Sequence, residues 1–72
     1  MNQEQFLRRV GNRIRDLRLA KKLSQEDMDS GDSAIPVTTY QEIEYGNRNF
    51  TMHTLFKISK RLGVDPRDLL DY

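Results

Sequence analysis

The chain has no cysteine and a single histidine, His53, among its 72 residues. Without cysteine it can form neither a disulfide framework nor a cysteine-based zinc site, and one histidine cannot build a metal site alone. Its fold must rest on packing, in a chain short enough to bury only about 60% of its unfolded surface. So small a core implies no ligand pocket, and we expect no metal, cofactor or small-molecule substrate.

Long apolar runs are also missing from the sequence. No run approaches the roughly 18 residues of a membrane-spanning helix, and the start M-N-Q-E-Q lacks the basic-then-apolar pattern of a secretory signal. We therefore expect a cytoplasmic protein that does not enter a membrane. Charged residues make up 32% and hydrophobic residues 36% of the chain, which leaves enough periodic apolar positions for one folded domain over residues 1–72.

The net charge of +1 conceals an uneven distribution along the chain. Residues 1–22 carry seven basic and two acidic side chains, residues 23–45 six acidic and no basic ones, and residues 46–72 five basic and three acidic ones. The overall charge predicts nothing about nucleic acid. A basic run on a long amphipathic helix is usually a solvated face, and the alternative is a direct DNA contact by Arg8, Arg9, Arg13 and Arg15. The acidic middle segment suits a basic partner surface.

Hydrophobic periodicity predicts a first helix over about residues 3–21. Its apolar side chains recur at spacings of four, four and three, which places on one stripe Phe6, Val10, Ile14 and Leu17. A second, short helix is predicted to begin at Gln25, because Ser24 can cap its first turn and Asp27 follows three residues later. The turn-forming cluster S-G-D-S at residues 30–33 ends this helix.

Three further helices are predicted in the second half of the chain. One spans about residues 37–45 and is followed by Gly46, a residue type common after a helix C-cap. The next has Thr51 as its N-cap and ends at Gly63. The last is short and follows D-P at residues 65–66, an N-cap and a proline at the first helical position. Because nothing in the sequence predicts a strand, we expect an all-α, compact five-helix domain.

Four sequence fragments, taken in order, are typical of one protein family. They are R-I-R-D-L-R at 13–18, L-S-Q-E at 23–26, I-E-Y-G-N-R-N at 43–49 and T-L-F-K-I-S-K-R-L-G-V at 54–64. In this order and at this spacing they resemble the Cro/C1-type helix-turn-helix family, the lambda-repressor-like DNA-binding domains. The resemblance covers nearly the whole chain, and the segment G-N-R-N-F-T resembles the controller proteins of restriction-modification systems in particular.

The resemblance implies a helix-turn-helix over about residues 24–46, whose second helix, at about 37–45, lies in the major groove. It implies base contacts from the start and middle of that helix: Val37, Thr38, Gln41 and Glu42. It implies phosphate contacts from the preceding helix start and the following loop: Ser24, Gln25, Asn47, Arg48 and Asn49. It also implies a structural ion pair between Arg18 and Glu44.

The chemistry of these side chains agrees with such roles. Glu42 can accept from cytosine N4, Gln41 can pair with adenine through two hydrogen bonds, and the Thr38 methyl can contact that of thymine. The alternative interpretation is a solvated helix face, with Ser24 as a simple cap. Compared with the family, the chain has one extra residue between L-S-Q-E and I-E-Y-G, which we place within S-G-D-S.

We therefore expect a sequence-specific transcriptional regulator that binds double-stranded DNA as a homodimer, with half-sites about one helical turn apart. The last helix is the expected dimer interface: Leu69, Leu70 and Tyr72. The alternative is a protein-interaction module of the same fold that uses its acidic segment and binds no physiological DNA. Catalysis is not expected, because no nucleophile has a base beside it and no glycine-rich phosphate loop is present.

Overall fold

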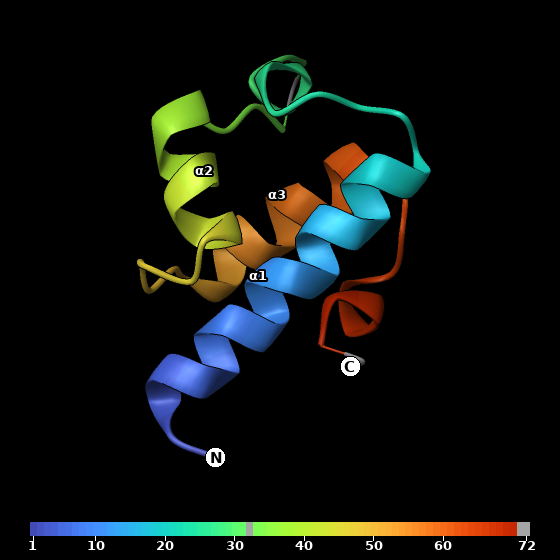
Figure 1. Ribbon diagram of the computed structural model, residues 1–72. Helices are drawn as coiled ribbons and strands as arrows, with labels where there is room; N and C mark the ends of the chain where they lie inside the picture. Colours follow the sequence, from blue (N-terminus) through green and yellow to red (C-terminus); the bar gives the residue numbers. More distant parts are fainter. Residues whose placement is uncertain (32, 71–72) are drawn as a thin grey trace.

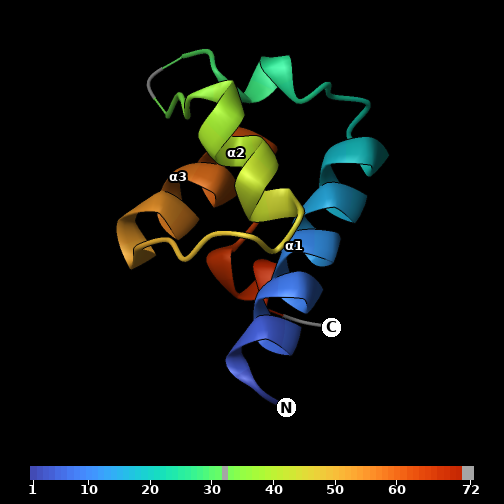
Figure 2. The same ribbon diagram turned by 60° about the vertical axis from the view of Figure 1, so that its left-hand side comes forward.

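The computed structural model describes residues 1–31 and 33–70, and no strand occurs among them. Its elements are three α-helices and two single 3₁₀ turns, in the order α1 (Gln3–Ala20), η1 (Glu26–Met28), α2 (Val37–Glu44), α3 (Met52–Leu62) and η2 (Pro66–Leu69). Helix α2 packs against α1, and η2 packs against both α1 and α3 (Figures 1 and 2). Within the described residues no helix is long and apolar enough to cross a membrane.

Local capping explains where α1 and α3 begin and where α3 ends. Asn2 and Gln5 form a reciprocal capping box at the start of α1. At the start of α3, the Thr51 hydroxyl accepts from the Thr54 N–H at 3.2 Å, and Gly63 ends the helix with a φ of 72°. The three predicted α-helical segments are confirmed, each to within one residue at its C-terminal end.

The expected second helix is a single 3₁₀ turn, η1, so this expectation is corrected. Its start is as predicted, because the Asp27 N–H donates to the Ser24 hydroxyl at 3.1 Å and the Ser24 N–H to the Asp27 carboxylate at 2.7 Å. The turn does not continue because the Asp27 carbonyl, which a longer α-helix would use, accepts from the Ser30 hydroxyl and from Arg61 Nε, each at 2.8 Å.

The expected fifth helix is likewise a single 3₁₀ turn, η2. Asp65 and Asp68 form the capping box that begins it, with Pro66 at the first helical position. Arg13 Nε of α1 donates to the Asp68 carbonyl at 2.8 Å, which satisfies that acceptor without a further helical turn. The five-helix expectation therefore reduces to three α-helices with two 3₁₀ turns.

One hydrophobic cluster joins all five elements. Its buried members are Val10, Ile14, Met28, Ile35, Tyr40, Ile43, Leu55, Ile58, Leu62 and Leu69. Phe6 of the predicted stripe is exposed instead, as are Met52 and Phe56 of α3. These exposed side chains leave apolar surface on α1 and α3.

Helices α1 and α2 approach each other closely at Gly11. A Cβ atom at this position would lie 2.5 Å from the Glu44 carbonyl oxygen and 2.6 Å from that of Ile43. The chain then reverses at Gly46, whose φ is 75° and whose own added Cβ would lie 2.8 Å from Arg8 Cγ. The backbone of α2 and of its C-terminal turn therefore lies directly on the surface of α1.

Gly11→Ala should lower the free energy of unfolding by roughly 1–3 kcal/mol, the usual effect of overpacking. A decrease would be informative, because replacing glycine with alanine in an open helix interior raises the free energy of unfolding by about 1 kcal/mol. Asn12→Ala is the matched control, since Asn12 is the next residue of α1 and is exposed. Urea denaturation of both variants is the measurement, and an unchanged or higher midpoint for Gly11→Ala would contradict the close contact.

Candidate nucleic-acid interface

Helix α2 has one buried face and one outward face. Tyr40, Ile43 and Glu44 are buried against the rest of the molecule. The outward face carries side chains at positions i, i+1, i+4 and i+5, all at least partly exposed: Val37, Thr38, Gln41 and Glu42. The structure thus brings the four expected base contacts together on one side of one short helix.

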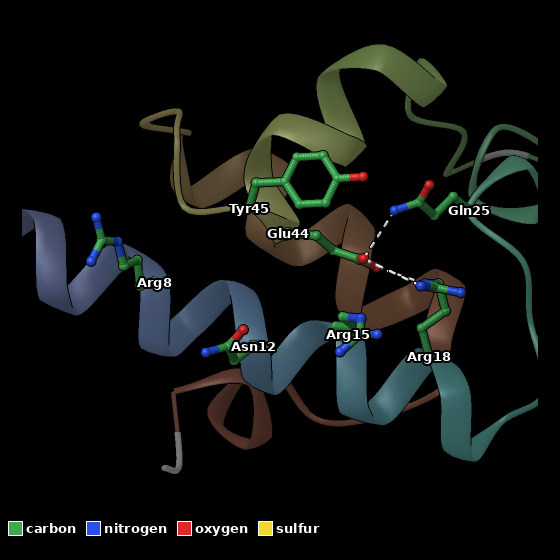
Figure 3. A pocket seen from close by; sticks show the side chains of 7 residues that line it. All are labelled: Arg8, Asn12, Arg15, Arg18, Gln25, Glu44 and Tyr45. Carbon is green, nitrogen blue, oxygen red and sulfur yellow. Dashed lines mark hydrogen bonds and ion pairs between the residues drawn. The ribbon is translucent and has the colours of Figure 1, made fainter.

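Glu44, although on the same helix, is turned into the molecule toward Arg18 of α1. Arg18 Nε donates to Glu44 Oε2 at 2.6 Å and Arg18 Nη2 to Oε1 at 3.2 Å (Figure 3). Glu44 is 2% and Arg18 7% exposed. A third donor, Arg18 Nη1, binds the Leu23 carbonyl at 2.8 Å. The two residues that the resemblance pairs therefore lie in a buried ion pair, and Glu44 presents no charge on the outward face.

The ionisation of Glu44 reflects two opposed effects. Burial alone raises the pKa of its carboxyl group, but the hydrogen bonds from Arg18, aided by Tyr40 and Gln25, outweigh it and hold the pKa below the ordinary value of 4.5. Burial and the neighbouring carboxylate raise the pKa of Tyr40 far above 10.0, so this phenol stays neutral. Within the described chain the Tyr40 hydroxyl makes no hydrogen bond of standard geometry, so it affects the pair electrostatically.

A line of amide groups connects this buried pair to the outward face of α2. Gln25 Nε2 donates to Glu44 Oε1 at 3.1 Å, and Gln41 Nε2 donates to Gln25 Oε1 at 2.9 Å. Sequence reasoning missed this connection, because Gln25 and Gln41 are 16 residues apart and no spacing rule relates them. Gln25, the expected phosphate contact, and Gln41, the expected base contact, are therefore hydrogen-bonded to each other.

Glu42 is paired with Arg48 from the loop after α2. Arg48 Nη1 lies 2.8 Å from Glu42 Oε2, and both side chains are about half exposed. The pairing follows from the reversal at Gly46, after which the Asn47 N–H donates to the Glu42 carbonyl at 3.0 Å. This pair, which the sequence analysis did not foresee, neutralises the remaining carboxylate of α2.

The expected phosphate contacts come from two segments that border α2. Ser24, Asn47, Arg48 and Asn49 are exposed, whereas Gln25 is partly buried. Asn49 Oδ1 accepts from Gln3 Nε2 at 2.9 Å, which ties the loop after α2 to the start of α1. These side chains offer neutral hydrogen-bond donors, with a positive charge at Arg48.

The expected dimer residues differ in how far they are exposed. Leu69 is fully buried in the core, Leu70 is 42% exposed, and Tyr72 lies outside the described residues. In residues 1–31 and 33–70 no group of three or more His, Asp or Glu side chains could hold a metal ion.

Glu44→Ala should lower the melting temperature, because it leaves the Arg18 guanidinium buried without its counter-charge. Removing one partner of a buried pair costs about 3–5 kcal/mol, against a total stability of about 5–15 kcal/mol for a typical domain. Glu42→Ala is the matched control, since its exposed pair is worth only about 0–1 kcal/mol. Thermal unfolding followed by circular dichroism is the measurement, and equal melting temperatures would refute the structural role of Glu44.

The pH dependence of stability provides a second test of this role, with the variant Glu44→Gln. Because the pKa of Glu44 is lower in the folded state, its charge stabilises fully above the ordinary value of 4.5, and this contribution is lost as the pH falls through the folded-state pKa. The difference in unfolding free energy between the wild type and Glu44→Gln should therefore shrink below pH 4.5. A difference that stays constant into acid would show that the charge of Glu44 is not what stabilises the fold.

The comparisons with known proteins agree with this geometry. The helix-turn-helix family matches residues 14–69. Control protein C.BamHI of Bacillus amyloliquefaciens is 37% identical over 62 residues, which cover 86% of this chain and 76% of that protein. The crystal structure of the restriction-modification controller protein C.AhdI from Aeromonas hydrophila matches with a TM-score of 0.82 at 35% identity, over 88% of this chain and 94% of that one. The resemblance is confirmed, and the chain belongs to the Cro/C1-type helix-turn-helix family of DNA-binding regulators, with restriction-modification controller proteins among its homologues.

Proposed function

We propose that this protein is a sequence-specific transcriptional regulator that binds a two-fold operator as a homodimer, each chain acting as a single helix-turn-helix domain with α2 in the major groove. The observation that carries the proposal is the outward face of α2. Its four expected base contacts stand together there, bordered by Gln25 and by the loop of residues 47–49. In helix-turn-helix proteins the second helix reads bases while the preceding one crosses the phosphate backbone.

Gln41 is oriented for base recognition by its bond to Gln25. After donating one N–H to Gln25, it keeps its carbonyl oxygen and its second N–H. These are the acceptor and the donor that adenine N6 and N7 require in the major groove. Thr38 and Val37, one turn earlier, present methyl groups suited to thymine.

Glu42 serves as an acceptor for cytosine N4 while Arg48 cancels its charge. Arg48 binds Oε2, which leaves Oε1 for the base. A guanidinium has five N–H donors, so Arg48 can hold Glu42 and still bind a phosphate. The pair thus allows an acidic side chain to stand close to a polyanion without net repulsion.

Phosphate contacts fix the position of α2 without reading the sequence. Ser24 and Gln25 supply them before η1, and Asn47, Arg48 and Asn49 supply them after α2. Most of these groups are neutral, so they add hydrogen bonds but release few counterions. Binding by this surface alone would be weakly salt-dependent for a DNA-binding protein.

Dimerisation uses the apolar surface around Leu70. A hollow of about 300 Å³ beside Leu70 is lined mainly by apolar side chains, among them Phe6, Phe50, Met52 and Leu55. Met52 is 76% exposed, and Leu69 supports Leu70 from the core beneath. One such domain buries only about 600–1,000 Å² on DNA, so two are needed for useful specificity.

The rival function, a protein-interaction module with an acidic surface, loses the part of its support that lay on α2. There Glu44 is buried beside Arg18 and Glu42 is paired with Arg48, whereas Glu26, Asp27 and Asp29 around η1 remain exposed. Little unpaired negative charge is left on α2 for a basic protein partner.

Selection of bound sequences from a random duplex library at two salt concentrations should enrich an inverted repeat. Arg48→Ala should weaken binding to the operator and to all other sequences alike. The slope of log affinity against log salt should become shallower by the amount expected for one lost phosphate contact. Glu42→Ala should instead relax the preference at one base pair of each half-site, with a loss of about 1–3 kcal/mol in the discrimination between bases. Quantitative binding to an operator and to its single-site variants is the measurement.

The double variant Glu42→Ala/Arg48→Ala separates the two roles of Arg48. If Arg48 only neutralised Glu42, the double variant would bind random DNA as well as Glu42→Ala does; a phosphate contact predicts that the loss persists. No enriched sequence at either salt concentration would overturn the proposed function and favour the protein-interaction module.

Leu70→Glu should raise the dissociation constant of the dimer roughly tenfold or more, because dimerisation would bury an unpaired carboxylate. Leu19→Glu is the matched control, since Leu19 is similarly exposed but lies near the end of α1, away from the hollow beside Leu70. Sedimentation equilibrium measures both variants. Equal dimer affinities for the wild type and Leu70→Glu would place the dimer surface elsewhere.

A further inference from the structure

A polar hollow of about 580 Å³ opens between α1 and the C-terminal end of α2. Figure 3 shows the side chains of α1 on one side, Tyr45 and Gln25 on the other, and the Arg18–Glu44 pair between them. Besides that pair, the hollow is lined by Arg8, Asn12, Arg15, Gln25 and Tyr45. The expected interface residues include only Gln25 of these five, so the hollow is largely a separate feature.

The α1 side of the hollow is a row of hydrogen-bond donors. Arg8, Asn12 and Arg15 recur at spacings of four and three, which aligns them along one stripe of the helix. Across residues 1–31 and 33–70, neither Asn12 nor Arg15 has a side-chain hydrogen bond or ion pair. Arg8 forms an exposed pair with Glu4 at 2.7 Å, of a kind worth only about 0–1 kcal/mol. All three side chains are therefore available to a ligand.

The hollow has an excess of positive charge. The carboxylate of Glu44 is cancelled by Arg18, so the charge of the lining comes from Arg8 and Arg15. The Tyr45 side chain is exposed, and its hydroxyl has no hydrogen-bond partner among the described residues, so it is a further donor. Such a combination of guanidinium, amide and hydroxyl donors suits an anion with several acceptor oxygens.

The position of Arg8 is fixed by packing. An added Cβ at Gly46 would lie 2.8 Å from Arg8 Cγ and 2.9 Å from Arg8 Cα, so the chain reversal after α2 rests on this residue. The stem of Arg8 is thereby held against the end of α2, while its guanidinium lies in the exposed pair with Glu4. Arg15, seven residues later, lies about 10 Å along the helix axis from Arg8.

We propose that this hollow binds the phosphate backbone of duplex DNA, with Arg8 and Arg15 as ligands of separate phosphates next to the bases that α2 reads. The inference rests on the proposed function. Gln25 carries the argument for DNA, because it lines the hollow and also holds Gln41 on the outward face of α2. A strand that passes Gln25 continues over the stripe of α1. The hollow thus supplies the positive charge that the outward face of α2 lacks.

The test is the salt dependence of DNA binding by Arg8→Gln and Arg15→Gln. Glutamine keeps Cβ and the Cγ that lies next to Gly46, and it replaces the charged guanidinium with a neutral amide. The matched control is Arg67→Gln, which removes the same charge from an exposed arginine on η2, on the far side of α1 from α2 in Figure 1. Each α1 variant should raise Kd several-fold for operator and random duplexes alike, with a slope of log affinity against log salt shallower by about 0.9.

Phosphate ethylation interference provides a readout that a merely structural role would not move. Ethylation of particular phosphates should weaken binding by the wild type and by Arg67→Gln, and one of these positions should lose its effect in each α1 variant. If Arg8→Gln and Arg15→Gln match Arg67→Gln in slope and interference pattern, this inference is overturned while the proposed function stands. If the wild type itself shows no salt-dependent binding to DNA, both fail.

Discussion

The buried pair of Arg18 and Glu44 determines how the rest of the interface is arranged. Removing either partner would leave an unpaired charge inside the molecule, so the pair holds α2 in one position relative to α1. From it, hydrogen bonds reach the Leu23 carbonyl, Gln25 and then Gln41. A rotation of α2 about its axis would break the bonds to Glu44 and to Gln41 together. The pair therefore sets which face of α2 points outward.

That position depends on a close approach of two helices. Helix α2 has only eight residues, too few to be stable alone in water, so its geometry comes from what it packs against. Gly11 lets the carbonyl groups at the end of α2 lie on α1, which brings Glu44 within 2.6 Å of Arg18. Packing and electrostatics are thus parts of one constraint, because a larger residue at Gly11 would move the carboxylate as well as the helix.

The sequence was informative where structure depends on neighbours in the chain and less so where it depends on distant ones. Caps and apolar spacing located α1, α2 and α3, because those signals are local. The two 3₁₀ turns were expected as helices, since the groups that end them come from 34 and 55 residues away: Arg61 on the Asp27 carbonyl and Arg13 on that of Asp68. For the interface, family resemblance located the outward residues, but not the links of Gln25 to Gln41 or of Arg48 to Glu42.

These links explain how an acidic helix can approach DNA. Glu44 is internal, Glu42 is matched by Arg48, and the outward face is left nearly neutral. A nearly neutral face gives little non-specific affinity, because that affinity comes mainly from phosphate neutralisation. In the function proposed above, attraction comes from beside the helix, from Arg48 and from the stripe of Arg8 and Arg15, while α2 discriminates between bases. In that function a single domain makes few charged contacts, so a second copy on the same operator would double both the attraction and the base discrimination. The proposed dimer, rather than the monomer, would then be the unit that finds the site.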